Sequence, residues 1–180
     1  MFIAIEGIDC NGKSTVSKML AKERDAILYR TPPKNIIARR DEIDAKATPI
    51  EHYRFYLDGI RTASKEIWEI LASGKEVVCD RYWLSTYVYH VAMGVSVNTD
   101  DFADIIWPDL TVLLLVSSDV QAKLFLERGM SIGDRRMSNR QLELAKEFKK
   151  AMTRFPIPQL IVNTDHHCPA EIVDKIQSCT

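Results

Sequence analysis

Apolar and polar positions divide the chain of 180 residues into two kinds of segment. Short apolar runs rich in β-branched residues are typical of buried strands, and they lie at 2–5, 26–29, 76–79, 111–116 and 160–162. Longer segments with helical spacing of apolar residues lie at 13–22, about 50–72, 84–93, 119–127, 138–152 and 169–177. Strands that alternate with helices indicate a parallel sheet covered on both faces. The pattern therefore predicts a three-layer α/β/α fold around a five-stranded parallel sheet.

Residues at the ends of the expected helices support these limits. Ser138 and Gln141 fit a capping box, Gly74 follows a helix as its C-cap, and Pro169 suits a first helical turn. No repeat, linker or low-complexity tract interrupts the chain, so residues 1–180 are expected to form a single domain. A polar, basic and weakly patterned segment separates two good helices, which predicts a mobile lid loop at about 128–140.

Composition narrows the class of ligand. The chain is 46% hydrophobic and 27% charged, which is ordinary for one globular domain with a sizeable core. Its net charge of -1 gives no long-range field that would attract nucleic acid or an anionic membrane. Locally arranged groups must therefore bind any anion, and the expected partner is a small charged molecule.

The cysteines and the N-terminus indicate the compartment. Cys10, Cys79, Cys168 and Cys179 show no C-x-x-C spacing, which favours free thiols in a reducing cytoplasm. The first apolar run is broken by Glu6 and lacks a basic flank, and no stretch approaches the ~20 apolar residues of a membrane span. The N-terminus is therefore expected to begin the fold itself.

The strongest motif lies between the first expected strand and the first expected helix. Gly7, Gly12, Lys13 and Ser14 meet the phosphate-loop pattern G-x-x-x-x-G-K-[ST] in the context that the motif requires. Backbone N–H groups and the helix dipole would hold the phosphates of a nucleoside triphosphate, with Lys13 on the β and γ phosphates and the Ser14 hydroxyl on Mg²⁺. The expected triphosphate-binding residues of this loop are Gly7, Ile8, Asp9, Cys10, Asn11, Gly12, Lys13, Ser14 and Thr15.

A family resemblance rests on two segments, FIAIEGIDCNGKST at 2–15 and VVCDRYWLSTYVYH at 77–90. Both strongly resemble the thymidylate kinase family, which transfers the γ-phosphoryl group of ATP to dTMP. The resemblance covers nearly the whole chain, with weaker matches at 29–32 and 108–112 and in the arginine-rich loop. It implies a P-loop NTPase fold of the nucleoside monophosphate kinase type, ATP and Mg²⁺ as cofactors, and a homodimer.

Acceptor chemistry explains the arginines that follow two strands. Two anions must be brought together in line, and arginine grips phosphate bidentately without losing its charge. Arg30 and Arg81 each stand at a strand end, where open α/β sheets bind ligands. The resemblance implies that both hold the acceptor phosphate and that Asp80 lies near Mg²⁺. The alternative is a structural salt bridge between Asp80 and Arg81.

Other residues are expected on the acceptor side. Asp9 brings a carboxylate into an anion-binding loop, so it either pairs with a cation or contacts the acceptor. Ser85, Tyr89 and His90 align with the family pattern S-x-x-A-Y-Q. The resemblance implies that Tyr89 stands against the sugar and disfavours a 2′-hydroxyl. Ordinary helix packing is the alternative for Tyr89, and a core or surface role is the alternative for His90.

Charge for the transition state is expected from the lid loop. Some thymidylate kinases carry an arginine in the phosphate loop, but this chain has Cys10 and Asn11 there. The lid-loop candidates are Arg128, Arg135, Arg136 and Arg140, with Asp134-Arg135 as the best match and a solvated basic loop as the alternative. We therefore predict Lys13, Asp9, Arg81, Arg135 and Arg136 as catalytic residues, and Arg128 as a further ATP contact.

The base site departs from the family. An aromatic residue and an arginine a few places later hold thymine in the family, whereas this chain offers Phe55 or Tyr56 for stacking but has Gly59 and Ile60 near the expected arginine. Arg61 could substitute only with a shift of register. The predicted acceptor is therefore a deoxynucleoside monophosphate, with dTMP as the first choice and another base still open.

Two rival functions stay open. A deoxynucleoside kinase would phosphorylate a 5′-hydroxyl and benefit from a carboxylate base, but Arg30, Thr31 and Pro32 after the second strand offer no acid. A non-catalytic nucleotide-binding homologue would be expected to lose Lys13, Arg81 or the loop arginines, and all are present.

Overall fold

A computed structural model describes residues 1–129 and 140–180, with only the backbone of Arg128. Its sheet has five parallel strands in the order β2-β3-β1-β4-β5. They are β1 (Phe2–Glu6), β2 (Ile27–Arg30), β3 (Val77–Asp80), β4 (Leu110–Leu115) and β5 (Gln159–Asn163). All five strands begin and end within a few residues of the predicted limits, so the predicted sheet is confirmed.

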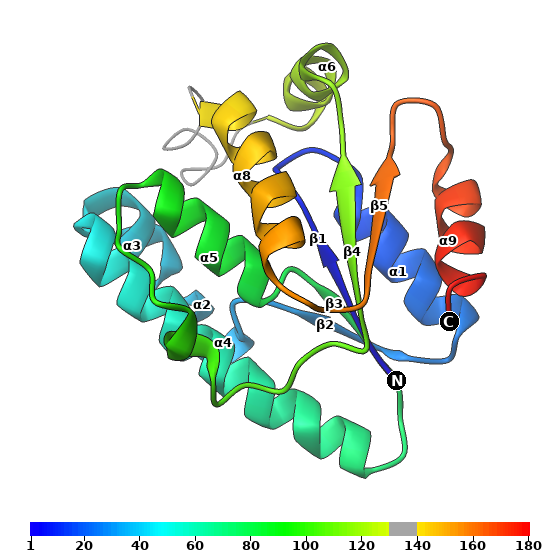
Figure 1. The fold of residues 1–180 in the computed structure, drawn as a ribbon, viewed down its shortest axis with the longest axis horizontal. Coiled ribbons are helices and arrows are strands. Elements are labelled where there is room, and N and C mark those ends of the chain that lie inside the picture. The colour runs from blue at the N-terminus through cyan, green and yellow to red at the C-terminus, as the bar shows by residue number, and fades with distance from the viewer. Residues whose placement is uncertain (130–139) are drawn as a thin grey trace.

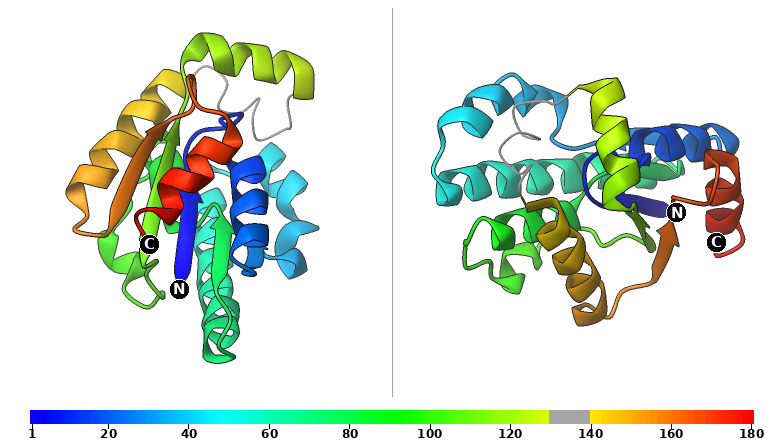
Figure 2. Two further views of the ribbon diagram at one scale, coloured as in Figure 1. Left: turned by 90° about the vertical axis from the view of Figure 1, so that its right-hand side faces the viewer. Right: turned by 90° about the horizontal axis from the view of Figure 1, so that it is seen from above.

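Helices cover both faces of this sheet (Figure 1, Figure 2). One face carries α1 (Lys13–Glu23) and α9 (Pro169–Gln177), and the other carries α4 (Pro49–Ala72), α5 (Trp83–Ala92) and α8 (Gln141–Arg154). Alternate side chains of β1 explain the two cores, because Ile3 and Ile5 pack with α1 and α9 whereas Phe2 and Ala4 pack with α4, α5 and α8. The three-layer prediction is therefore confirmed.

The ends of two predicted helices are also confirmed. Gly74 follows α4 with φ 83°, and its N–H donates to Leu71 O at 2.9 Å. Pro169 occupies the first turn of α9. Ser138 of the predicted capping box lies outside the described residues, and α8 begins at Gln141.

Short helices between the main elements were not predicted. These are α2 (Lys34–Ile37), α3 (Arg40–Lys46) and the 3₁₀ helix η1 (Thr99–Phe102). Each is too short to show a repeating apolar face, which explains why the sequence pattern missed them. The sixth main helix, α6 (Ser118–Arg128), follows β4 and lies beyond the carboxyl ends of the strands (Figure 1).

Two further sequence expectations concern cysteines and membranes. Cys10, Cys79, Cys168 and Cys179 are all free thiols. Within the described parts of the chain, no helix combines the length and apolar character needed to cross a bilayer.

Candidate active site

The phosphate loop connects β1 to α1 at the carboxyl edge of the sheet. Gly7 has φ 137°, and a Cβ there would lie 2.4 Å from Leu114 O on β4, so only glycine fits. Gly12 is left-handed, with φ 85°, and directly precedes α1. Asn11 is buried between these glycines and donates from Nδ2 to Leu114 O at 2.6 Å. The loop is thus held to β4 by a hydrogen bond, and it leads directly into the N-terminus of α1.

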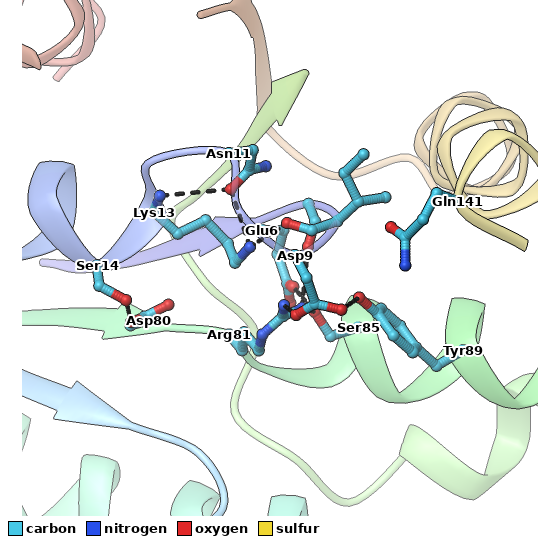
Figure 3. Close-up of polar contacts among 12 residues, drawn as sticks. Glu6, Asp9, Asn11, Lys13, Ser14, Asp80, Arg81, Ser85, Tyr89 and Gln141 are labelled. Atoms are coloured by element: carbon cyan, nitrogen blue, oxygen red, sulfur yellow. Dashed lines mark hydrogen bonds and ion pairs between the residues drawn. The ribbon is translucent and has the colours of Figure 1, made fainter. Parts of the chain in front are cut away.

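Lys13 lies inside this loop (Figure 3). Its Nζ donates to Asn11 Oδ1 at 2.9 Å and to Ile8 O, and the residue is 5% exposed. Burial and the neighbouring charge of Arg81 lower the pKa of Lys13 to about 7, although Asp9 and other carboxylates oppose that change. An anion that reaches Lys13 would therefore favour the protonated amine.

A second group of polar atoms joins β2, β3 and α1. Ser14 Oγ donates to Asp80 Oδ2 at 2.7 Å, and Arg30 reaches the same oxygen from Nη2 at 2.8 Å. The strand register places Arg30 directly beside Asp80. Although burial raises the pKa of Asp80, Lys13, Ser14 and Arg30 hold it below its ordinary value. The strand end therefore carries an ionised carboxylate between the loop and an arginine.

Arg81 connects the phosphate loop to α5. Its backbone is left-handed, with φ 68°, and its Nη1 donates to Gly7 O at 2.9 Å and to Ser85 Oγ at 3.1 Å. Its Nη2 forms an ion pair with Asp9, whose other carboxylate oxygen accepts from the Tyr89 hydroxyl at 2.6 Å. Figure 3 shows Asp9 between Arg81 and Tyr89. The predicted cation, carboxylate and phenol thus form one connected group.

Glu6 is a site residue that sequence reasoning missed. It is fully buried at the end of β1, where its carboxylate accepts from the N–H groups of Tyr82 at 2.9 Å and Leu84 at 3.2 Å and from the Ser85 hydroxyl. Burial raises the pKa of Glu6 against the effect of these hydrogen bonds and of Arg81. The available signal was a lone acidic residue in an otherwise apolar strand, directly before the loop.

Lys13, Ser14, Asp80 and Arg81 line one cavity of about 630 Å³, whereas Glu6 lies beneath it and is not part of its lining. The cavity extends from the phosphate loop past Arg30 and Arg81 to residues of α3, α4 and α5. Predicted site residues that line it are Asp9, Cys10, Asn11, Gly12, Lys13, Ser14, Thr15, Arg30, Tyr56, Asp80, Arg81, Ser85, Tyr89 and His90. Arg40, Asp44 and His52 line it as well and were not predicted. The signal for them was an arginine and an aspartate four residues apart, followed by a histidine next to an aromatic run.

Other predicted residues lie elsewhere. Gly7 and Ile8 belong to the loop without lining the cavity. Phe55 contacts the ring of Tyr56 edge-on and the Arg39 guanidinium, outside the cavity. Arg61 turns away from the cavity: its Nη2 donates to Asp101 O of η1 at 3.2 Å, and its Nε lies 3.3 Å from Asp104 Oδ2, beyond the end of η1. Neither Phe55 nor Arg61 is thus placed to hold a base.

Of the four arginines predicted for the lid, one has a described side chain. Arg135 and Arg136, with Asp134, lie outside the described residues, and the side chain of Arg128 is also not described. Arg140 is described, and its guanidinium donates to Ala92 O at the end of α5. The mobile lid at about 128–140 and its catalytic arginines therefore stay predictions.

A phosphate loop on an open parallel sheet, facing a second set of cations, defines the class of P-loop nucleotide kinases. The family model for thymidylate kinase matches residues 5–176. The chain therefore belongs to the thymidylate kinase family.

Similar proteins agree with this assignment. A probable thymidylate kinase of Methanocaldococcus jannaschii is 28% identical, over 82% of this chain and 83% of its own length. A thymidylate kinase of Wolbachia pipientis is also 28% identical, over 98% of this chain and 100% of its own. The solved structure of Candida albicans thymidylate kinase matches with a TM-score of 0.83 at 17% identity, over 98% of this chain and 89% of its own, which supports the fold.

Proposed function

We propose that this protein transfers the γ-phosphoryl group of ATP to the 5′-phosphate of dTMP, giving ADP and dTDP. The observation that carries the proposal is the arrangement of cations in one cavity. Lys13 belongs to the phosphate loop, and Arg30 and Arg81 stand at the neighbouring strand ends. Two phosphate groups can therefore be held together in one space, which is the main requirement of phosphoryl transfer.

On the donor side, the loop backbone and Lys13 would bind the triphosphate. Negative charge builds up on the bridging oxygen as its bond to the γ-phosphorus breaks, and a protonated Lys13 is placed in the loop to offset that charge. An acceptor phosphate oxygen forms the new bond to the same phosphorus. No general base is needed, because a monophosphate is already ionised at neutral pH.

On the acceptor side, Arg81 is the best-placed cation for the monophosphate. Its contacts with Gly7 O and Asp9 fix the guanidinium against the phosphate loop, so a phosphate bound to it lies beside the donor. Tyr89 shares Asp9 with Arg81, which supports its predicted position against the sugar. Asp9 thus pairs with Arg81, and this ion pair offsets the negative charge of the carboxylate inside a site that binds anions.

The residues at the loop also fit Mg²⁺. This ion prefers hard oxygen ligands and takes one or two of them from protein, with phosphates and water completing its shell. The Ser14 hydroxyl and the ionised Asp80 carboxylate, 2.7 Å apart, supply such oxygens. When bound, Mg²⁺ would neutralise charge on the β and γ phosphates.

The proposal is tested by a coupled ATP-consumption assay against dTMP, the other deoxynucleoside monophosphates and the corresponding nucleosides. We expect turnover of dTMP that depends on Mg²⁺. The Lys13→Met variant should lose phosphoryl transfer while keeping the wild-type circular dichroism spectrum, and Arg61→Gln, outside the cavity, serves as the matched control. Turnover of thymidine without turnover of dTMP would contradict the proposal.

Three finer features belong to the same proposal. The charge that stabilises the transferring phosphoryl group comes from Arg135 and Arg136, the molecule acts as a homodimer, and it works in the cytoplasm. The free cysteines support the reducing compartment. Light scattering coupled to size-exclusion chromatography tests the dimer, and a monomeric mass at micromolar concentration would count against it.

A further inference from the structure

The end of the cavity that lies away from the phosphate loop is formed by polar residues from three helices. Arg40 and Asp44 lie on α3, His52 and Tyr56 on α4, and His90 on α5. Tyr56 stacks on His52 with ring centroids 4.6 Å apart. The phosphate loop and the arginines at the strand ends occupy the other part of the cavity, so these five residues lie where the acceptor's base is expected.

Asp44 is the centre of this cluster. It is 4% exposed and accepts from the Tyr56 hydroxyl at 2.8 Å. The Arg40 Nε lies 3.3 Å from its Oδ2, and His52 Nε2 lies 3.1 Å from its Oδ1. Although burial raises the pKa of Asp44, hydrogen bonds from His52 and Tyr56 and the charge of Arg40 hold it below its ordinary value. The cluster therefore contains a buried carboxylate that fixes the Arg40 side chain.

The two histidines connect α5 to Asp44. His90 Nδ1 contacts the carbonyl oxygen of Thr86, and His90 Nε2 lies 2.8 Å from His52 Nδ1. His52 Nε2 lies 3.1 Å from Asp44 Oδ1. A continuous chain of polar contacts therefore runs from the backbone of α5 through both rings to the carboxylate.

This chain of contacts occupies both histidine rings. His52 and His90 are 6% and 1% exposed, and every ring nitrogen is engaged by His90, His52, Thr86 or Asp44. The pair therefore orients Asp44. The side chain of Arg40, in contrast, is 39% exposed and lines the cavity. Arg40 is thus the charged member of the cluster whose side chain is partly exposed at the cavity.

Helix α4 does not supply the arginine that is expected to hold the base in the family. Ile60 is 2% exposed in the core, and Arg61 pairs with Asp104 and with the backbone of η1. Among the described residues, the arginines that line the cavity are Arg30, Arg40 and Arg81, and the first and last belong to the phosphate region. Arg40 is therefore the arginine available to the base.

We infer that Arg40 determines which base the acceptor nucleotide carries. A guanidinium has only donors, so it favours a base that presents a carbonyl oxygen to α3, such as thymine or uracil with O4. Cytosine presents an amino group at the same position, and two donors then face each other. The inference rests on the proposed function, because it concerns the acceptor of that reaction, and it makes Arg40 a specificity-determining residue.

The test is the ratio of kcat/KM for dTMP to kcat/KM for dCMP in the wild-type enzyme and in Arg40→Gln. A glutamine amide both donates and accepts hydrogen bonds, so it can pair with the amino group of cytosine as well as with O4 of thymine. A hydrogen bond from a charged donor corresponds to roughly a 10- to 100-fold effect. We expect kcat/KM for dTMP to fall by about that factor, kcat/KM for dCMP to change much less, and KM for ATP to stay as in the wild type.

Two further variants serve as controls. Arg61→Gln removes a guanidinium that lies outside the cavity, so its dTMP-to-dCMP ratio should equal that of the wild type. The double variant Arg40→Gln/Asp44→Asn removes both charges of the ion pair and leaves no buried carboxylate without its cation. Thermal unfolding shows whether the single variant folds. If it folds poorly, the double variant replaces it in the test and should show the same loss of base preference.

The outcomes separate the two claims. A wild-type enzyme that phosphorylates dTMP, with a ratio unchanged within about twofold in both Arg40 variants, overturns the role of Arg40 alone. An equal loss for every base does the same, because it assigns Arg40 a structural role. A wild-type enzyme that phosphorylates no monophosphate overturns the proposed function, and the inference about Arg40 falls with it.

Discussion

Lys13 gives the most specific prediction about this site. Its pKa of about 7 means that in this arrangement the amine is only partly protonated near neutral pH. A triphosphate bound to the phosphate loop would place anionic oxygens beside Nζ and favour the charged form. Binding of ATP should therefore take up a proton, and its affinity should fall as the pH rises above the pKa of the free protein.

The size of the effect follows from linkage. With a pKa of about 7 and a bound pKa well above 9, about 0.9 proton should be taken up at pH 8 and only about 0.1 at pH 6. The protonated fraction falls from about one half at pH 7 to about 0.01 at pH 9. Affinity for ATP should therefore be about 50-fold weaker at pH 9 than at pH 7.

Isothermal titration calorimetry can measure both quantities. Titrations at pH 8 in several buffers of different ionisation enthalpy give the number of protons taken up from the slope of the apparent enthalpy. Lys13→Gln, which replaces the amine with an uncharged amide one bond nearer the backbone, reports the protons exchanged by ATP itself and by other groups. Equal proton uptake in the two proteins, or uptake near zero in the wild type, would refute the assigned pKa and its cause.

Three further predictions concern residues around the loop. Gly7→Ala should lower the free energy of unfolding by about 2–4 kcal/mol, measured by urea denaturation, because its Cβ would meet Leu114 O; wild-type stability would contradict the tight approach. Glu6→Gln turns an amide N–H₂ toward one of three hydrogen-bond donors and should cost about 1–3 kcal/mol in the same measurement, whereas no loss would mean that water can replace the carboxylate. Tyr89→Phe should raise kcat/KM for a ribonucleotide acceptor relative to its deoxy counterpart, and an unchanged ratio of UMP to dUMP would place the phenol away from the sugar.

The sequence was sufficient to predict the sheet and the position of the phosphate loop. Apolar runs such as 111–116 are typical of buried strands. The glycines and the lysine of the phosphate loop have fixed spacing because the loop wraps one kind of ligand. Both signals are local, so no knowledge of distant contacts was needed. The arginines at the strand ends were predictable for a related reason, because parallel strands bring their carboxyl ends to one edge.

The end of the cavity that lies away from the phosphate loop was not predictable in this way. Arg40 and Asp44 belong to a helix of seven residues, which has too few turns to show a periodic face. His52 and His90 are 38 residues apart in the chain and meet only because α4 packs on α5. Glu6 could be read only as an interruption of an apolar strand, since its three donors come from residues 82–85. Contacts of this kind depend on tertiary packing.

The end of β1 holds Arg81 at a fixed position relative to the phosphate loop. Ile5 O accepts from the Arg81 N–H at 3.0 Å, Glu6 binds the first turn of α5, and Gly7 O accepts from the Arg81 guanidinium at 2.9 Å. Three consecutive residues thus hold Arg81 and the start of α5 while the same chain continues into the phosphate loop. Since two phosphates repel each other, holding their binding groups in place removes much of the cost of bringing them together. Disturbing Glu6 should therefore reduce turnover as well as acceptor binding, because Arg81 would move relative to the loop.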